Sequence, residues 1–356
     1  MGSLCLLLLS VMASLAVGED QLLTPTGTYP NDPYNQTFWG LGWGELTKRG
    51  MTQHFLQGQR LKKAYVDTYG LIPAKYNRNQ VYVRSATTPR CLQSATSAIA
   101  GLYSGSATFP TDVDGWPANW TPIPIHSVPF AEDLELEYGG SCKKVGILRA
   151  ERDLFATILE HGGANLTMEF DTLFNIYQSI SIEKGVYNLT LPAWITDNVY
   201  NRLMNVVDSA EDFVYGGAGF GYPQDDEYVK LRGGFLLKMY IDNFNAATKG
   251  GEKLRIYNGH DFSTLGLLQT LECKEELMGK KDPDYASGVV GELWKRTDGQ
   301  FYVKFLYTDN AYTDLRPFTR LISGCPNDSD FCLLSTFVNR GTKYSNVQAA
   351  DCDPLH

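Results

Sequence analysis

Hydrophobic and polar positions along the chain follow two periods, one helical and one extended. Apolar residues recur every three or four positions over 47–69 and 91–103, which predicts amphipathic helices there. The same period predicts further helices over 153–177, 196–215, 230–245 and from Ser263 onward. Short runs rich in β-branched and aromatic residues predict strands at 80–85, 253–258, 289–294 and 301–307. Strands that alternate with helices in this way indicate an α/β fold.

Three segments outside these elements are predicted to be loops or surface. Residues 105–138 are rich in Pro, Trp and Asp, which predicts a long surface excursion. The glycine-rich residues 216–221 lack the spacing of a nucleotide-binding loop, so we expect a mobile loop. The acidic groups at 132–133 and 225–227 are expected on the solvated surface, and a cation site there is the less favoured alternative.

The N-terminus carries an apolar run over 4–17, followed by small residues and then by Glu19 and Asp20. This order is typical of a secretory signal, here cleaved after Gly18, although no Lys or Arg precedes the run. The run is shorter than a membrane-spanning helix requires. We therefore expect an exported chain, secreted or delivered to the lysosomal lumen, with no membrane anchor after cleavage.

Two further features agree with export. Removal of Cys5 with the signal leaves six cysteines, an even set that suits disulfides in an oxidising compartment. Cys325 and Cys332 enclose a turn-forming Pro-Asn-Asp sequence, so a local bridge between them is expected. No Cys-x-x-Cys spacing suggests a metal site, and we expect neither a metal nor a cofactor. Candidate glycosylation sites are the five Asn-x-Ser/Thr sequons, at Asn35, Asn119, Asn165, Asn188 and Asn327.

Composition narrows the class of protein. The chain has 40 acidic and 31 basic side chains and a net charge of −9, which argues against a nucleic-acid-binding surface because phosphate neutralisation needs clustered Lys and Arg. Its 43% hydrophobic and 20% charged residues are ordinary for a folded globular protein. A length of 356 residues suits two domains, or one large α/β domain with an insertion.

Chemically useful side chains follow two of the predicted strands. Arg84 ends the strand at 80–85, and His260 with Asp261 follows the strand at 253–258, each just before a helix. Ligands collect at the carboxyl ends of strands in open α/β sheets, where helix N-termini favour anions. An arginine fork matches phosphate, and a His beside an Asp offers a donor and a general acid. The alternative is that Arg84 pairs with a nearby carboxylate.

These positions belong to longer motifs that resemble those of the histidine acid phosphatases, most of all the animal prostatic and lysosomal branch. The resemblance extends over roughly residues 23–352. The matching stretches are LTKRGMTQH at 46–54, VRS at 83–85, GLY at 101–103, PIHSVP at 124–129, NLTLPAW at 188–194, LRGG at 231–234 and YNGHD at 257–261.

The resemblance implies a histidine-phosphatase-like mixed α/β sheet flanked by helices, in one domain over 19–352 with a short tail at 353–356. Roughly residues 105–230 would form the excursion and an inserted, mostly helical cap. It implies hydrolysis of phosphate monoesters through a phosphohistidine, and it allows a homodimer. Arg84 and His260 would bind the phosphoryl oxygens, and Asp261 would protonate the leaving oxygen. It further implies disulfides Cys142–Cys352 and Cys325–Cys332, which leaves Cys91 and Cys273 as a third pair.

One departure from the family is severe. Its Arg-His-Gly-x-Arg-x-Pro motif, which supplies the nucleophilic histidine, does not occur in the 356 residues. Pro25 matches the last residue of the motif, and Glu19, Asp20 and Leu23 stand where its arginine, histidine and second arginine belong. The family's first strand is expected before them, where the signal lies; if the signal is retained, residues 6–17 could fill that slot as an apolar strand. The remaining histidines are expected to be structural or solvated: His54, His126, His161 and His356.

The sequence therefore predicts an exported acid phosphatase family protein whose turnover in this form is close to background. Its substrates would be small phosphate monoesters or phosphoproteins. The alternative is a non-catalytic secreted glycoprotein that keeps part of a phosphate pocket.

Overall fold

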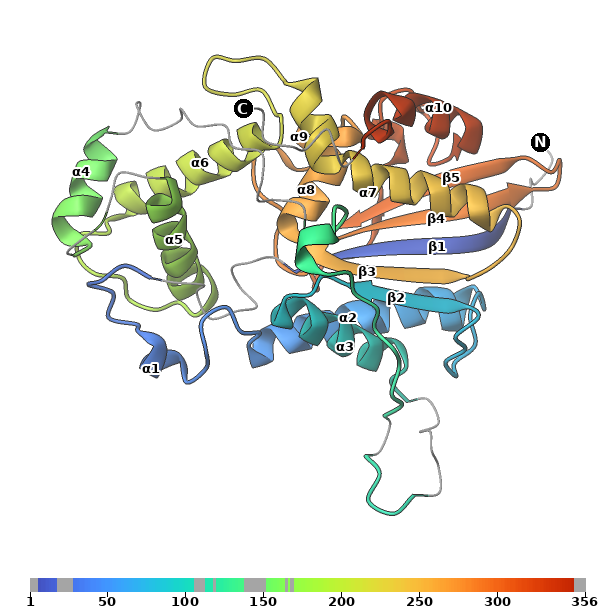
Figure 1. The fold of residues 1–356 in the computed structure, drawn as a ribbon, viewed down its shortest axis with the longest axis horizontal. Helices are drawn as coiled ribbons and strands as arrows, with labels where there is room; N and C mark the ends of the chain where they lie inside the picture. Colours follow the sequence, from blue (N-terminus) through green and yellow to red (C-terminus); the bar gives the residue numbers. More distant parts are fainter. Residues whose placement is uncertain are drawn as a thin grey trace.

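A central sheet of seven strands organises the molecule, with the strand order β2-β3-β1-β4-β5-β6 and β7 paired to β5 (Figure 1). The computed structural model describes residues 6–17, 28–105, 113–117, 120–137, 152–163, 166 and 170–348. The strands are β1 (Leu6–Val17), β2 (Val81–Ser85), β3 (Leu254–His260), β4 (Gly288–Arg296), β5 (Phe301–Thr308), β6 (Arg316–Pro317) and β7 (Cys332–Leu333). β1, β2 and β3 run parallel, whereas β4 pairs antiparallel with β1 and with β5.

Helices cover both faces of the sheet, so the strands are buried on both sides (Figure 1). One face packs α2 (Lys48–Leu61) and α3 (Pro89–Leu102) against side chains such as Val83, Ile256 and Val290. The other face packs α7 (Asp226–Ala247), α8 (Asp261–Thr270) and α10 (Leu334–Ser345) against the alternate residues of the same strands, such as Tyr257 and Val289. Burial on both faces explains why these strands appear as continuous apolar runs in the sequence.

Close contact between α2 and α3 depends on two glycines. A Cβ atom at Gly58 would collide with the carbonyl oxygen of Ala98, and one at Gly101 with that of Phe55. The two backbones can approach this closely only because neither position has a side chain. α2 continues into the π-helix η1 (Lys62–Thr68), so the predicted helix over 47–69 is present as two joined pieces.

The helical cap lies to one side of the sheet, beyond the carboxyl ends of the parallel strands (Figure 1). It contains α4 (Arg152–His161), α5 (Phe170–Ile180), the π-helix η4 (Ser181–Val186) and α6 (Asp197–Val214). These elements share an apolar core of their own, which includes Tyr29. The short elements α1 (Gln36–Trp39), η2 (Phe130–Glu132), α9 (Lys274–Met278) and η5 (Thr319–Leu321) lie in connections.

Residues 6–17 form β1, the strand between β3 and β4. Its backbone pairs in parallel with β3, from Val11 beside Leu254 to Val17 beside His260. In the 356-residue chain this segment therefore occupies the slot of the first strand, which is the second of the two roles considered for it. Cleavage after Gly18 in an exported chain stays a prediction. None of the described helices is long and apolar enough to cross a membrane.

The cysteines correct one expectation. A disulfide joins Cys325 to Cys332, as predicted, with 5.3 Å between the Cα atoms. The pairing of Cys91 with Cys273 is wrong, because both are buried free thiols. The Cys91 sulfur faces Thr88 and His260, whereas that of Cys273 donates to the carbonyl oxygen of Leu268. Residues of other predicted features lie outside the described part of the chain: Glu19, Asp20, Leu23, Asn119, Cys142, Asn165, Cys352 and His356.

Candidate functional site

The two predicted site positions meet at one edge of the sheet. β2 and β3 are parallel neighbours, with Arg84 paired to Tyr257 and Ser85 to Asn258. Arg84 therefore lies near the carboxyl end of β2 and His260 at the carboxyl end of β3. α3 begins four residues after β2, and α8 begins directly after His260. Both side chains consequently stand where helix N-termini and strand ends converge, the usual place for an anion site.

Arg84 is buried and already paired with carboxylates. Its Nη2 lies 2.5 Å from Asp133 Oδ1 and 3.0 Å from Glu135 Oε2. Burial lowers the pKa of a guanidinium, but the two carboxylates outweigh it and raise the pKa of Arg84. For Asp133 the effect of burial is the larger one. Burial raises the pKa of this carboxyl by more than the Leu136 amide and Arg84 lower it, so its pKa is raised. The carboxylate-pairing alternative for Arg84 is thus present in the structure.

His260 is almost fully buried and also has a carboxylate partner. Its Nε2 lies 3.0 Å from Glu137 Oε2, and because a carboxylate only accepts, Nε2 carries the donated proton. The other Glu137 oxygen accepts from the Thr87 amide at 2.9 Å, the Thr88 amide at 3.4 Å and the Thr87 hydroxyl at 3.3 Å. Burial raises the pKa of Glu137, but His260 and the two amides outweigh burial, so the pKa is lowered.

Neighbouring groups fix the orientation of the imidazole. The Phe262 ring stacks on it, with 4.5 Å between centroids and 13° between planes. The Cys91 sulfur lies 3.7 Å from Nε2. The His260 amide donates to Ser263 Oγ, and that hydroxyl donates to the carbonyl oxygen of Leu136. Since Leu136 lies between the two carboxylates of Glu135 and Glu137, the same contacts tie the acidic segment to the site.

Asp261 is the first residue of α8 and is half-buried. One of its carboxylate oxygens accepts a hydrogen bond from the Phe262 amide at 2.7 Å. Its sequence neighbour His260 faces Glu137. The two residues of the His-Asp pair therefore differ in exposure: the histidine is buried and the carboxylate is more accessible. This accessibility suits a group that would exchange a proton with a leaving oxygen.

The other described histidines make different contacts. His54 on α2 is fully buried, and burial lowers its pKa to about 3, so it stays neutral. His126 pairs its backbone with Arg84 while its ring stacks on Tyr82. His161 on α4 stacks on Trp194 in the cap. No cluster of three or more His, Cys, Asp or Glu side chains that could hold a metal occurs in the described ranges.

Several buried polar side-chain atoms have no hydrogen-bond partner among the described residues. Both side-chain polar atoms of Asn258 lack a hydrogen bond, and Asn258 pairs through its backbone with Leu15 of β1. The same holds for both ring nitrogens of His54 and for the side-chain oxygen of Gln53, both on α2. Native proteins seldom leave such groups unsatisfied.

Sequence reasoning missed the three carboxylates of this site. Asp133 was expected on the solvated surface but is buried against Arg84. Glu135 and Glu137 drew no prediction. A signal was present, because acidic residues occupy 133, 135 and 137 while leucines occupy 134 and 136. A two-residue period of charge within a loop predicts that one side of the segment faces cations.

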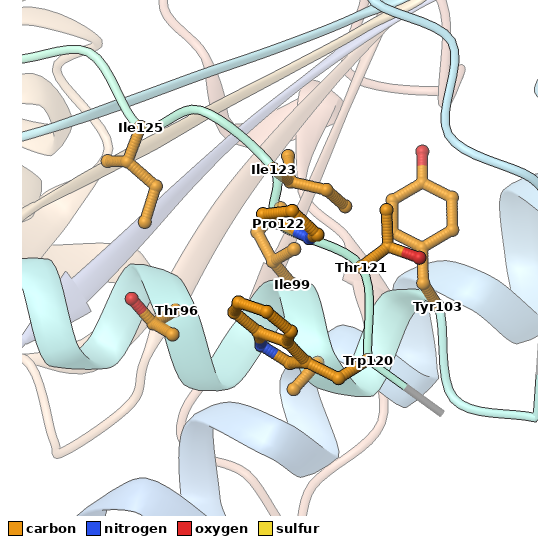
Figure 2. Close-up of a pocket in the computed structure, with 9 residues that line it drawn as sticks. Thr96, Ile99, Tyr103, Trp120, Thr121, Pro122, Ile123 and Ile125 are labelled. Atoms are coloured by element: carbon orange, nitrogen blue, oxygen red, sulfur yellow. The ribbon is translucent and has the colours of Figure 1, made fainter. Parts of the chain in front are cut away.

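A separate hollow of about 220 Å³ lies between α3 and residues 120–125 (Figure 2). Ile99 of α3 and Tyr103, the residue after α3, line one side, with Trp120 and Ile123 opposite. Its lining contains no charged side chain. This hollow therefore does not suit a phosphate, and the strand-end residues remain the candidate site.

Comparisons with known proteins give the family. Residues 18–308 match the Histidine phosphatase superfamily (branch 2). The chain is 32% identical to lysosomal acid phosphatase of Homo sapiens, covering 88% of this chain and 73% of the relative. It is 29% identical to prostatic acid phosphatase of Bos taurus, covering 88% and 80%.

Solved structures agree on the fold. A Hafnia alvei phytase in complex with tartrate superposes with a TM-score of 0.65 at 16% identity, over 98% of this chain and 99% of that one. A Bifidobacterium longum multiple inositol polyphosphate phosphatase in complex with phosphate gives a TM-score of 0.62 at 13% identity, over 99% and 96%. Together with the strand-end arginine and His-Asp pair, these matches show that the chain belongs to branch 2 of the histidine phosphatase superfamily.

Proposed function

We propose that this chain is an exported acid phosphatase family protein whose ligands are phosphate monoesters, and whose turnover in this form is close to background. The observation that carries the second part is the lack of an Arg-His-Gly sequence in the 356 residues. Hydrolysis through two displacements requires a nucleophile, and Asp20 stands where the resemblance expects it.

The retained residues would share the remaining work. Arg84 and His260 would bind the phosphoryl oxygens, because both present N–H donors at the same sheet edge. Asp261 would give its proton to the leaving oxygen. Small esters and phosphoproteins both fit this role, since only the phosphate is addressed by these residues.

A second candidate is a non-catalytic secreted glycoprotein that keeps part of the phosphate pocket. The observation that favours it is that Arg84 and His260 already bind carboxylates of the same chain. Exposure of the three described sequon residues (Asn35, Asn188 and Asn327) supports glycosylation. The relatives named as lysosomal and prostatic enzymes support a lysosomal or secreted location. A homodimer is proposed by family resemblance alone.

The test is turnover of p-nitrophenyl phosphate at pH 5 by the purified chain. We expect a rate within a few-fold of a heat-inactivated sample, and the prostatic relative serves as the positive control. A robust rate that is lost on Asp261→Asn and kept in the exposed-site control Glu132→Gln would contradict the proposed loss of activity. Sequencing the 5′ region of the transcripts separates the two candidates, because an Arg-His-Gly segment between the signal and Gln21 would restore the enzyme.

A further inference from the structure

We infer that residues 130–137, here called the acidic strap, are an intramolecular ligand of the anion pocket. The pocket consists of the N-terminus of α3, Arg84 and His260, and the strap carboxylates occupy the places that an external phosphate would take. The inference rests on the proposed function, because a phosphate monoester is taken as the pocket's external ligand. Beyond the proposed function, the inference names the acidic strap as the occupant of the pocket and identifies the groups that bind it.

The His260 side of the pocket is a complete anion nest. Two backbone amides, Thr87 and Thr88, one hydroxyl and one imidazole N–H all donate to the two oxygens of Glu137. The amides belong to the turn that opens α3, a helix of 14 residues, so its dipole also favours negative charge here. A carboxylate with four donors from two segments far apart in the sequence is bound in the manner of a ligand.

On the Arg84 side of the pocket, carboxylates also take the place that a phosphate would occupy. Arg84 directs Nη2 at two carboxylates, one from Asp133 and one from Glu135. A phosphate monoester carries up to two negative charges and three terminal oxygens, which an arginine and a helix N-terminus bind together. The strap supplies its negative charges at 133, 135 and 137 with that same pair of partners.

The strap is held in place by more than charge. The Leu136 side chain is fully buried in the core that α7 and α8 share, and its carbonyl accepts from Ser263. The Leu136 amide donates to Asp133 Oδ1 at 3.0 Å, which fixes the turn between the acidic residues. An external phosphate therefore competes with a carboxylate that is already positioned, and the competition is intramolecular.

The test is rescue of a vacated nest by inorganic phosphate. Glu137→Ala removes both the charge and the volume of the resident carboxylate, while Glu137→Gln keeps the volume. At pH 7.5 and constant ionic strength, 20 mM phosphate should raise the Tm of Glu137→Ala by about 3 °C or more over chloride. The wild type and Glu137→Gln should shift by less than about 1 °C, since the nest is filled in both.

Two controls make the result specific. Glu132→Ala removes an exposed acid from the same strap and should behave as the wild type. Adding His260→Ala to Glu137→Ala should abolish the rescue. Phenyl phosphate in place of inorganic phosphate shows whether the vacated nest accepts an ester as well as the free ion.

The outcomes separate this inference from the proposed function. No phosphate effect on folded Glu137→Ala, checked by circular dichroism, would overturn the anion nest. Tight phosphate binding by the wild type that depends on Arg84 would overturn the strap as occupant and leave the proposed ligand class standing. Glu137→Ala could also fail to fold in chloride. In that case, recovery of folded protein by refolding in phosphate supports the inference. Failure to fold in both salts, while Glu137→Gln folds, overturns it.

Discussion

Two buried glutamates in this molecule have opposite protonation behaviour. Glu137, at the edge of the sheet, accepts hydrogen bonds from Thr87, Thr88 and His260, and its pKa is lowered. Glu183, in η4 of the cap, is fully buried, and the group that acts on it is another carboxyl, that of Asp32. Burial, with a smaller effect from the charge of Asp32, raises its pKa to about 10.

The difference shows that burial alone does not decide the charge of a carboxyl group. Desolvation acts on both residues in the same direction, so the donors around Glu137 reverse it. The consequences for folding are opposite as well. Glu137 is an anion whose hydrogen bonds stabilise the sheet edge, whereas Glu183 is a neutral acid whose burial does not stabilise the cap.

The largest expected effect is that of removing the partnered carboxylate. Glu137→Ala leaves His260 and the Thr87 and Thr88 amides buried without their acceptor, so we expect a loss of about 3 to 5 kcal/mol in the free energy of unfolding at pH 7.5. Urea unfolding followed by circular dichroism measures it. Glu132→Ala, an exposed acid five residues earlier, should change stability by less than about 0.5 kcal/mol. Equal losses in the two variants would remove the distinction between them.

A smaller and opposite effect is expected in the cap. Above the ordinary glutamate pKa of about 4.3 and below about 10, folded Glu183 keeps a proton that the unfolded chain releases. Folding stability therefore falls as the pH rises through this window. Glu183→Gln removes the linked proton, and we expect a gain of about 1 to 3 kcal/mol at pH 7.5 that disappears near pH 4.

The measurement is the Tm of this variant and the wild type between pH 4 and pH 9. Lys184→Ala is the matched control, because Lys184 is adjacent but forms an ion pair with an exposed Asp197. It should not alter the slope of Tm against pH. A wild type whose stability rises steadily from pH 5 to pH 9 would show that Glu183 is not protonated.

The smallest expected effect distinguishes the two ends of the acidic strap. Asp133 has a raised pKa and Glu137 a lowered one, so Asp133 should titrate above the ordinary pKa of an aspartate and Glu137 below the ordinary pKa of a glutamate. Stability from Glu137 is present above its ordinary pKa and lost as the pH falls through its lower folded-state pKa. The groups facing them are Arg84 and Glu135 at Asp133, and His260 at Glu137. Carboxyl chemical shifts in ¹³C-labelled protein measure both midpoints, and a midpoint on the other side of either ordinary pKa would contradict the prediction.

Local pattern predicted much of the fold because strands and helices were long and regular. Val81–Ser85 and Leu254–His260 appear as apolar runs followed by helices, so the meeting of Arg84 and His260 at one edge followed from parallel pairing. The strap contacts could not be predicted in this way. They join Arg84 to a residue 49 positions away and Glu137 to one 123 positions away, across a connection whose course no periodicity describes.

The cysteines illustrate the same limit. Cys325 and Cys332 are seven residues apart, so a turn brings them together and the sequence was sufficient. Cys91 and Cys273 are both buried, yet their sulfur atoms face different partners. Burial in one protein core does not bring two side chains within bonding distance, and only the packing of α3 and α8 decides it.

The central position of β1 affects the order in which the sheet can fold. Its neighbours on both sides come from the last third of the chain, since Val11 pairs with Leu254 and Leu6 with Arg296. Pairings between such distant segments form slowly, and during synthesis the N-terminal segment exists long before either neighbour. The middle of the sheet thus cannot be assembled before the last third of the chain has been made. Any factor that binds residues 6–17 early competes with strands that have not yet been made.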